Sequence, residues 1–149
     1  MNRTLGVLLL ASLFVASPLG AQEADPVKIT ADQFVIDEAA RIATFTGKVI
    51  VTRNDLTVWA PKVVVDYGDG GPSNIKSFVA SGGVRIKTKS QDATGNRAIY
   101  DPGAETLRIT GNVMVISASS TVGGPDLVID LNANTTVFSG GRVTGVFTP

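Results

Sequence analysis

The 149-residue sequence contains no cysteine and no histidine. The chain therefore cannot form a disulfide or use a thiolate nucleophile, and it lacks the commonest general base and zinc ligand. Its formal net charge is zero, from 13 Lys+Arg and 13 Asp+Glu, whereas domains that bind nucleic acid usually carry a basic surplus. We accordingly expect no enzyme, no cofactor, no metal site and no nucleic-acid partner.

Charged residues are also scarce. They make up 17% of the chain, against 44% hydrophobic residues, and this composition is too apolar for a disordered protein. The 16 glycines and 7 prolines punctuate segments rich in valine, isoleucine and threonine. This combination favours strands and turns over helices.

The first 21 residues read as a targeting segment. Arg3 precedes an apolar run over residues 5–16, which is too short to cross about 30 Å of hydrocarbon. Small residues then lead to a cleavage site after Ala21. We predict a cleaved signal peptide followed by a single domain over residues 22–149, with an uncleaved anchor as the alternative. Export without cysteine is typical of a bacterial periplasmic protein.

The rest of the chain is a repeat with a period of about 29 residues. Four segments share an apolar pattern with aspartate in seventh place, and they are Ala31–Asp37, Ala60–Asp66, Gly95–Asp101 and Gly124–Asp130. The longer middle interval is explained by extra residues in the loop 68–74. A fixed period of this size is typical of units that bury their apolar faces on their neighbours.

Within each unit the apolar residues alternate with a period of two, as in Val84-Arg85-Ile86-Lys87, which predicts strands. The expected strands are long and cover 27–37, 41–53, 56–67, 75–88, 92–101, 105–117, 120–131 and 135–148. After the first, each has a breaker near its middle, namely Gly47, Ala60-Pro61, Gly82-Gly83, Gly95, Gly111, Gly123–Pro125 and Gly140-Gly141. Glycine inside a strand marks a bulge or bend. We therefore predict an all-β fold of eight long strands bent at glycine and proline into about sixteen short ones. Two sheets would then face each other about 10 Å apart.

Alternation also assigns the residues of the inner faces. The predicted inward set is Phe34, Ile36, Phe45, Val49, Val51, Val63, Val65, Phe78, Ile86, Tyr100, Ile109, Val113, Leu127, Ile129 and Phe138. Val84, Leu107 and Val115 have the same orientation. The register near Pro61 and Pro125 leaves Leu56, Val58 and Trp59 unplaced. Composition alone does not distinguish a packed core from a trough that admits an acyl chain.

The polar residues of the repeat are expected at turns and on the outer face. The four aspartates at the strand ends, Asp37, Asp66, Asp101 and Asp130, are expected to cap turns, with calcium ligation as the weaker alternative. The basic residues Lys48, Arg85, Lys87 and Arg108 are expected to face outward. They would form a solvated surface or contact headgroup phosphates.

The two ends of such a meander keep unpaired backbone groups. The last strand is apolar, and Arg142 is its only charged residue. An unprotected edge is a site where the strand of another chain can be added. The predicted edge residues are Ile29, Ala31, Phe34, Val137, Val143 and Val146.

Several of these motifs together resemble a known family. The segments that contain the shared motif are Ile29–Gln33 with Phe45–Val49, Trp59–Val63 and Ala80–Val84. With the preceding signal segment they are similar to the lipopolysaccharide transport protein A family, also called the organic-solvent-tolerance A-like family. The resemblance covers nearly all of the chain after the signal segment and implies a half-open antiparallel β-jelly roll.

The resemblance also implies a function. Members act as periplasmic carriers that take lipopolysaccharide from an inner-membrane extraction complex and pass it to an outer-membrane translocon, with protomers stacked end to end. On this interpretation the inward set lines an acyl trough and no bond is made or broken. Two alternatives remain open: an inner-membrane-anchored sister component with the same fold, and a structural β-repeat module without a ligand.

Overall fold

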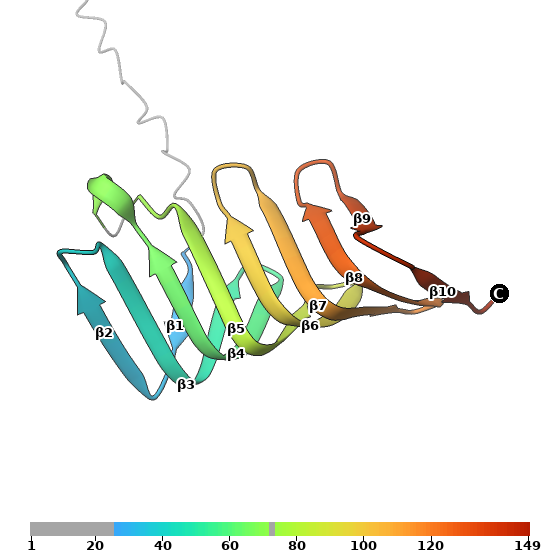
Figure 1. Ribbon diagram of the computed structural model, residues 1–149, viewed down its shortest axis with the longest axis horizontal. Coiled ribbons are helices and arrows are strands. Elements are labelled where there is room, and N and C mark those ends of the chain that lie inside the picture. The colour runs from blue at the N-terminus through green and yellow to red at the C-terminus, as the bar shows by residue number, and fades with distance from the viewer. Residues whose placement is uncertain (1–25, 72–73) are drawn as a thin grey trace, which may run out of the picture.

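Ten strands form one antiparallel sheet in the computed structural model, which describes residues 26–71 and 74–149 (Figure 1). The strands are β1 (Lys28–Thr30), β2 (Gln33–Asp37), β3 (Ile42–Arg53), β4 (Leu56–Asp66), β5 (Ser77–Lys87), β6 (Gln91–Asp101), β7 (Thr106–Ser117), β8 (Ser120–Asp130), β9 (Thr135–Ser139) and β10 (Thr144–Phe147). One 3-10 turn, η1 (Gly68–Gly70), joins β4 to β5. The predicted signal peptide lies outside the described residues. Within the two described ranges, no helix is long and apolar enough to cross a membrane.

The predicted strands agree closely with the observed ones, and the all-β class and the open antiparallel sheet are confirmed. The predicted division into about sixteen short strands in two sheets is wrong, because β3 to β8 run unbroken through their bends within one sheet. Only the first and last predicted strands are each divided in two. The last divides at Gly140, as expected. The first divides at Ala31 and Asp32 without a glycine. There the amide of Asp32 donates to the carbonyl groups of Thr46 (3.1 Å) and Gly47 (3.0 Å) on β3.

A fold line crosses the whole sheet near the middle of its strands. Each neighbouring pair from β3 to β8 changes register once, for example between Thr46 and Val49 of β3. In β3, β5 and β7 this point holds two successive residues with positive φ, namely Gly47–Lys48, Gly82–Gly83 and Gly111–Asn112. Glycine adopts this conformation without steric cost. The strands therefore all bend at one level, and the sheet has a V-shaped profile (Figure 1).

The fold line alters the alternation of side chains differently in successive strands. In β3 the inner residues that flank it, Phe45 and Val49, are four positions apart, so the odd-numbered positions stay inside. In β4 the inner residues Ala60 and Val63 are three apart, so the inner positions change from even to odd. Both arrangements turn the apolar side chains of the two halves of the V towards each other.

The core lies between the two halves of the folded sheet. Valine, isoleucine and leucine side chains from both halves form one buried cluster with Phe78 and Tyr100. Each such side chain stabilises the fold by about 1.5–3 kcal/mol when fully buried. The predicted inward residues that are buried are Val49, Val63, Val65, Phe78, Val84, Ile86, Tyr100, Leu107, Ile109, Val113, Val115, Leu127 and Ile129. For these residues the predicted inward orientation is confirmed.

The four repeated aspartates cap turns, as predicted. Their Oδ1 atoms accept hydrogen bonds from turn amides in all four units. The donor amides are Ala40 for Asp37 (2.9 Å), Gly68 for Asp66 (3.1 Å), Gly103 and Ala104 for Asp101 (2.9 and 3.1 Å), and Asn132 and Ala133 for Asp130 (2.9 and 2.8 Å). These bonds satisfy backbone donors where the chain leaves each strand.

The outer face carries paired charges. The guanidinium of Arg85 donates to both carboxylate oxygens of Asp92, at 3.0 and 2.6 Å. Arg108 makes the same bidentate contact with Asp126. The hydrogen bonds from the two arginines are the main cause that lowers the pKa of Asp92 and of Asp126. The predicted outward orientation of both arginines is confirmed.

The conformation at the fold line predicts the effect of one substitution. Gly111 has a φ of +83°, and a Cβ there would lie 2.5 Å from the side-chain nitrogen of Asn96. We expect Gly111→Ala to lower the free energy of unfolding by about 1–3 kcal/mol, measured by urea denaturation. Gly123→Ala is the control, because its nearest neighbour would be 3.6 Å away and its effect should stay within about 1 kcal/mol. Equal effects of the two substitutions would contradict this account.

The core predicts a second result. Ile109 and Leu127 are 0% exposed, so replacing either by alanine leaves a cavity and should destabilise the fold by about 2–5 kcal/mol. Ile116 lies on the outer face of β7 and is 50% exposed. Its replacement by alanine should change stability by only about 0.5 kcal/mol. Urea denaturation of the three variants tests this difference, and a comparable loss for Ile116→Ala would refute the assignment of faces.

Candidate functional site

Rows of apolar side chains run across the strands on the inner face of the V. On one half, each residue of a first row lies directly opposite the next one on the neighbouring strand. This row is Phe34, Phe45, Val63, Ala80, Ala98, Ile109, Leu127 and Phe138. A second row on the same half contains Ile36, Ala43, Val65, Phe78, Tyr100, Leu107 and Ile129. The facing half contributes Ile29, Val51, Val58, Ile86, Ala93, Val115 and Val122. The result is an apolar trough that extends from one edge of the sheet to the other.

The trough is closed in its middle and exposed at its ends. Val63, Ala80 and Ala98, in the middle, are at most 5% exposed, and burial extends to Leu127 on β8, whereas Phe34 and Ile36 at the first edge are 51% and 49% exposed. The ring of Phe34 stacks on that of Phe45 with centroids 4.6 Å apart. At the opposite edge, Phe138 packs against the core but is only partly buried. Apolar surface is therefore available to a ligand chiefly near the two edges.

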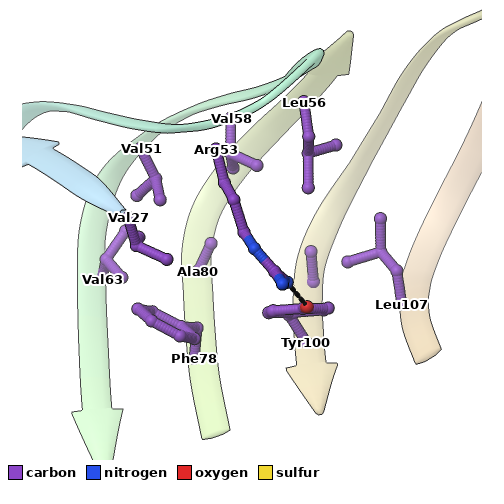
Figure 2. Close-up of a pocket in the computed structure, with 11 residues that line it drawn as sticks. Val27, Val51, Arg53, Leu56, Val58, Val63, Phe78, Ala80, Tyr100 and Leu107 are labelled. Atoms are coloured by element: carbon purple, nitrogen blue, oxygen red, sulfur yellow. Dashed lines mark hydrogen bonds between the residues drawn. The ribbon is translucent and has the colours of Figure 1, made fainter. Parts of the chain in front are cut away.

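A small apolar cavity lies on the open side of the V, between its two halves, and we call this opening the mouth of the trough (Figure 2). Its volume is about 40 Å³, little more than the space that one water molecule occupies in the liquid. Both halves of the V supply its walls, which are Val27, Val51, Arg53, Leu56, Val58, Val63, Phe78, Ala80, Ala98, Tyr100 and Leu107. In this conformation the cavity is too small for a long hydrocarbon chain, so the halves must separate before one could enter.

One polar cluster interrupts this apolar lining. The guanidinium of Arg53 donates to the hydroxyl of Tyr100, and the same hydroxyl donates to Glu105 Oε2 at 3.3 Å. Arg53 Nη1 also lies 3.6 Å from Glu105 Oε1. Burial is the main cause that raises the pKa of Tyr100. A tyrosine hydroxyl is neutral at neutral pH and can both donate and accept a hydrogen bond.

Sequence reasoning missed six residues that line the mouth cavity. They are Val27, Arg53, Leu56, Val58, Ala80 and Ala98, none of which belongs to the predicted inward set. The inner positions of Leu56 and Val58 on β4 become apparent only once the change of alternation at Pro61 is known. Trp59, also unplaced, lies on the outer face, where the guanidinium of Arg85 is 5.3 Å from its ring centroid.

Both edges of the sheet are open in the described part of the chain. β1 and β2 pair only with β3, and β9 and β10 pair only with β8. Of the predicted edge residues, Phe34, Val137, Val143 and Val146 are exposed. Ile29 and Ala31 are partly buried against the core. These strands therefore present free backbone groups beside exposed apolar side chains.

Two sequence relatives share nearly the full length of the chain. The lipopolysaccharide export system protein LptA of Haemophilus influenzae is 27% identical over 157 residues, which cover 96% of this chain and 91% of the relative. The protein of the same name from Escherichia coli K12 is 26% identical over 163 residues, covering 100% of this chain and 85% of the relative. The similarity thus extends over the whole folded sheet.

A solved structure has the same fold. LptH of Pseudomonas aeruginosa, described as the LptA-homologous periplasmic component of the lipopolysaccharide transport device, superimposes with a TM-score of 0.75. The match covers 84% of this chain and 96% of LptH at 18% identity. The sequence itself matches, over residues 28–135, the family described as LptA/(LptD N-terminal domain) LPS transport protein. Since this match spans well over half of the sequence, the chain belongs to that family.

Proposed function

We propose that this chain is a periplasmic carrier of lipopolysaccharide, which it shields during transport from the inner to the outer membrane. The observation that carries the proposal is the apolar trough, whose rows extend across the sheet from β2 to β9. Membership of the transport family and the names of the relatives support the same assignment.

The trough would bind lipid by desolvation. Acyl chains would lie between the two halves of the V, in contact with the predicted inward set, and Phe34 and Phe45 would make the first contact at the exposed edge. Each buried methylene contributes about 0.8 kcal/mol, which the lipid already gains in a bilayer. The carrier therefore needs only to match that environment, and no bond is made or broken.

Movement of the lipid would need partners at both ends of the path. We assign these roles to an inner-membrane extraction complex and an outer-membrane translocon. Copies of this chain would extend the path by stacking end to end, with β9 and β10 of one protomer beside β1 and β2 of the next. Support comes from the free edges and from exposed Val137 and Val146. Delivery to the periplasm would follow cleavage after Ala21.

Site-specific photo-crosslinking tests the trough. A benzophenone amino acid at Phe34 or Phe45 would sit on the inner face, and the same group at Val35 or Thr44 would sit on the outer face of the same strands. We expect adducts with lipopolysaccharide from the inner positions only, detected as a mobility shift on a denaturing gel. Ile109 is a poorer position because it is fully buried.

The matched outer positions make the result decisive. Val35 and Phe34 are almost equally exposed, at 52% and 51%, so a difference between them reports the face and not accessibility. Adducts of equal yield from both faces, or adducts from neither, would contradict the proposed carrier function.

Stacking predicts a defect from charge placed on the edge. We expect Val137→Lys, on β9, to weaken self-association at least threefold in sedimentation velocity, because an edge lysine opposes addition of a further strand. Ile116→Lys is the matched control, since Ile116 is similarly exposed but lies on β7 within the sheet. Equal weakening by both substitutions, or by neither, would argue against stacking through this edge.

A further inference from the structure

The polar cluster at the mouth joins the two halves of the V. Arg53 ends β3 on one half, whereas Tyr100 near the end of β6 and Glu105 in the following turn belong to the other. β3 and β6 are not neighbours in the sheet, because β4 and β5 lie between them. Figure 2 shows the Arg53 side chain extending across the mouth to the Tyr100 hydroxyl. This contact crosses the trough and does not run along the sheet.

The other ion pairs in the described ranges stay within one half. Arg85–Asp92 and Arg108–Asp126 join neighbouring strands on the outer face. Lys89–Asp55, at 3.0 Å, joins two turns at the tip of one half. Arg41–Asp69 joins two turns at the tip of the other. Among the described ion pairs, Arg53–Glu105 is thus the one that resists separation of the halves.

The surroundings of Arg53 also suit it to an anionic ligand. It is the one charged residue among the described residues that line the mouth cavity. Its side chain is 27% exposed and that of Glu105 is 29% exposed, so a ligand at the mouth can reach both. A guanidinium pairs with phosphate oxygens as readily as with a carboxylate.

We propose that Arg53, Tyr100 and Glu105 form a clasp that holds the mouth of the trough closed, and that a phosphate group of the incoming lipid opens it by replacing Glu105 as the partner of Arg53. This inference rests on the proposed function and adds to it the point of entry and the recognised group. The acyl chains would then enter beside the guanidinium that holds the phosphate. An amphiphile without phosphate would not pair with the arginine, so it would enter only when the clasp opens by itself and would load more slowly.

The first test needs no lipid. The chain has no cysteine, so Ser90→Cys and Ala104→Cys place two spin labels on exposed turns at the tips of opposite halves. We expect Arg53→Met, which keeps the apolar stem and removes the charge, to broaden the distance distribution and shift it to longer values. Asp55→Asn removes the Lys89 pair within one half and should leave the distribution unchanged. An unchanged distribution in Arg53→Met would overturn the clasp.

The second test measures loading. Fluorescence-detected binding is followed for phosphorylated and for chemically dephosphorylated lipopolysaccharide. In the wild type the phosphorylated form should load about two- to fivefold faster, the range expected for one partly exposed ion pair. Glu105→Gln should accelerate both forms, Arg53→Met should make the two rates equal, and Asp55→Asn should behave as the wild type. Rates that depend on phosphate equally in wild type and Arg53→Met would overturn the exchange of partners.

The two tests separate this proposal from the carrier function. If the wild type fails to bind either lipid, the proposed function fails, while the spin-label distances still decide whether the clasp holds the halves together. If lipid binds normally but neither the distances nor the rates respond to Arg53→Met, the carrier function stands and the clasp is wrong. Thermal unfolding monitored by circular dichroism confirms that each variant is folded before it is compared.

Discussion

The structure depends on one backbone constraint, the bend that every long strand makes at the same level. A flat antiparallel meander of these strands would expose one apolar face along its whole length. In β3, β5 and β7 the bend is made by residues with positive φ. In β4, β6 and β8 the inner residues on either side of the bend are three positions apart, where regular alternation would place them two or four apart. Together these bends fold the apolar face onto itself. The buried cluster follows from this bend, because within residues 26–71 and 74–149 no separate layer covers the apolar side chains.

The sequence was most informative where the period of two is unbroken. Strand limits, turn-capping aspartates and the inward orientation of residues such as Val63 and Leu127 could be predicted, because each depends on local alternation or turn chemistry. Leu56 and Val58 could not be placed, since Pro61 changes which positions of β4 face inward. The Arg53–Tyr100 contact, between strands that are not neighbours, leaves no periodic signal at all.

The same fold line that creates the trough also sets its width. The two halves are covalently continuous at the bend and free at the tips, so the tips can separate with least disturbance of the ladder hydrogen bonds. The mouth contains both the small cavity and the Arg53 cluster. A few polar contacts at the mouth lie far from the bend, so they oppose separation of the two halves most effectively. The same contacts near the bend would have little effect on that separation.

The distribution of exposed apolar surface would link lipid binding to the proposed stacking. Phe34 and Ile36 are half exposed because β2 has a neighbour on one side only. A second protomer added at this edge would cover both side chains and continue the apolar rows into its own trough. Stacking would thereby turn the most exposed part of each trough into an interior section, and it would leave exposed ends only at the first and last copies. A lipid could then pass from one protomer to the next without crossing water.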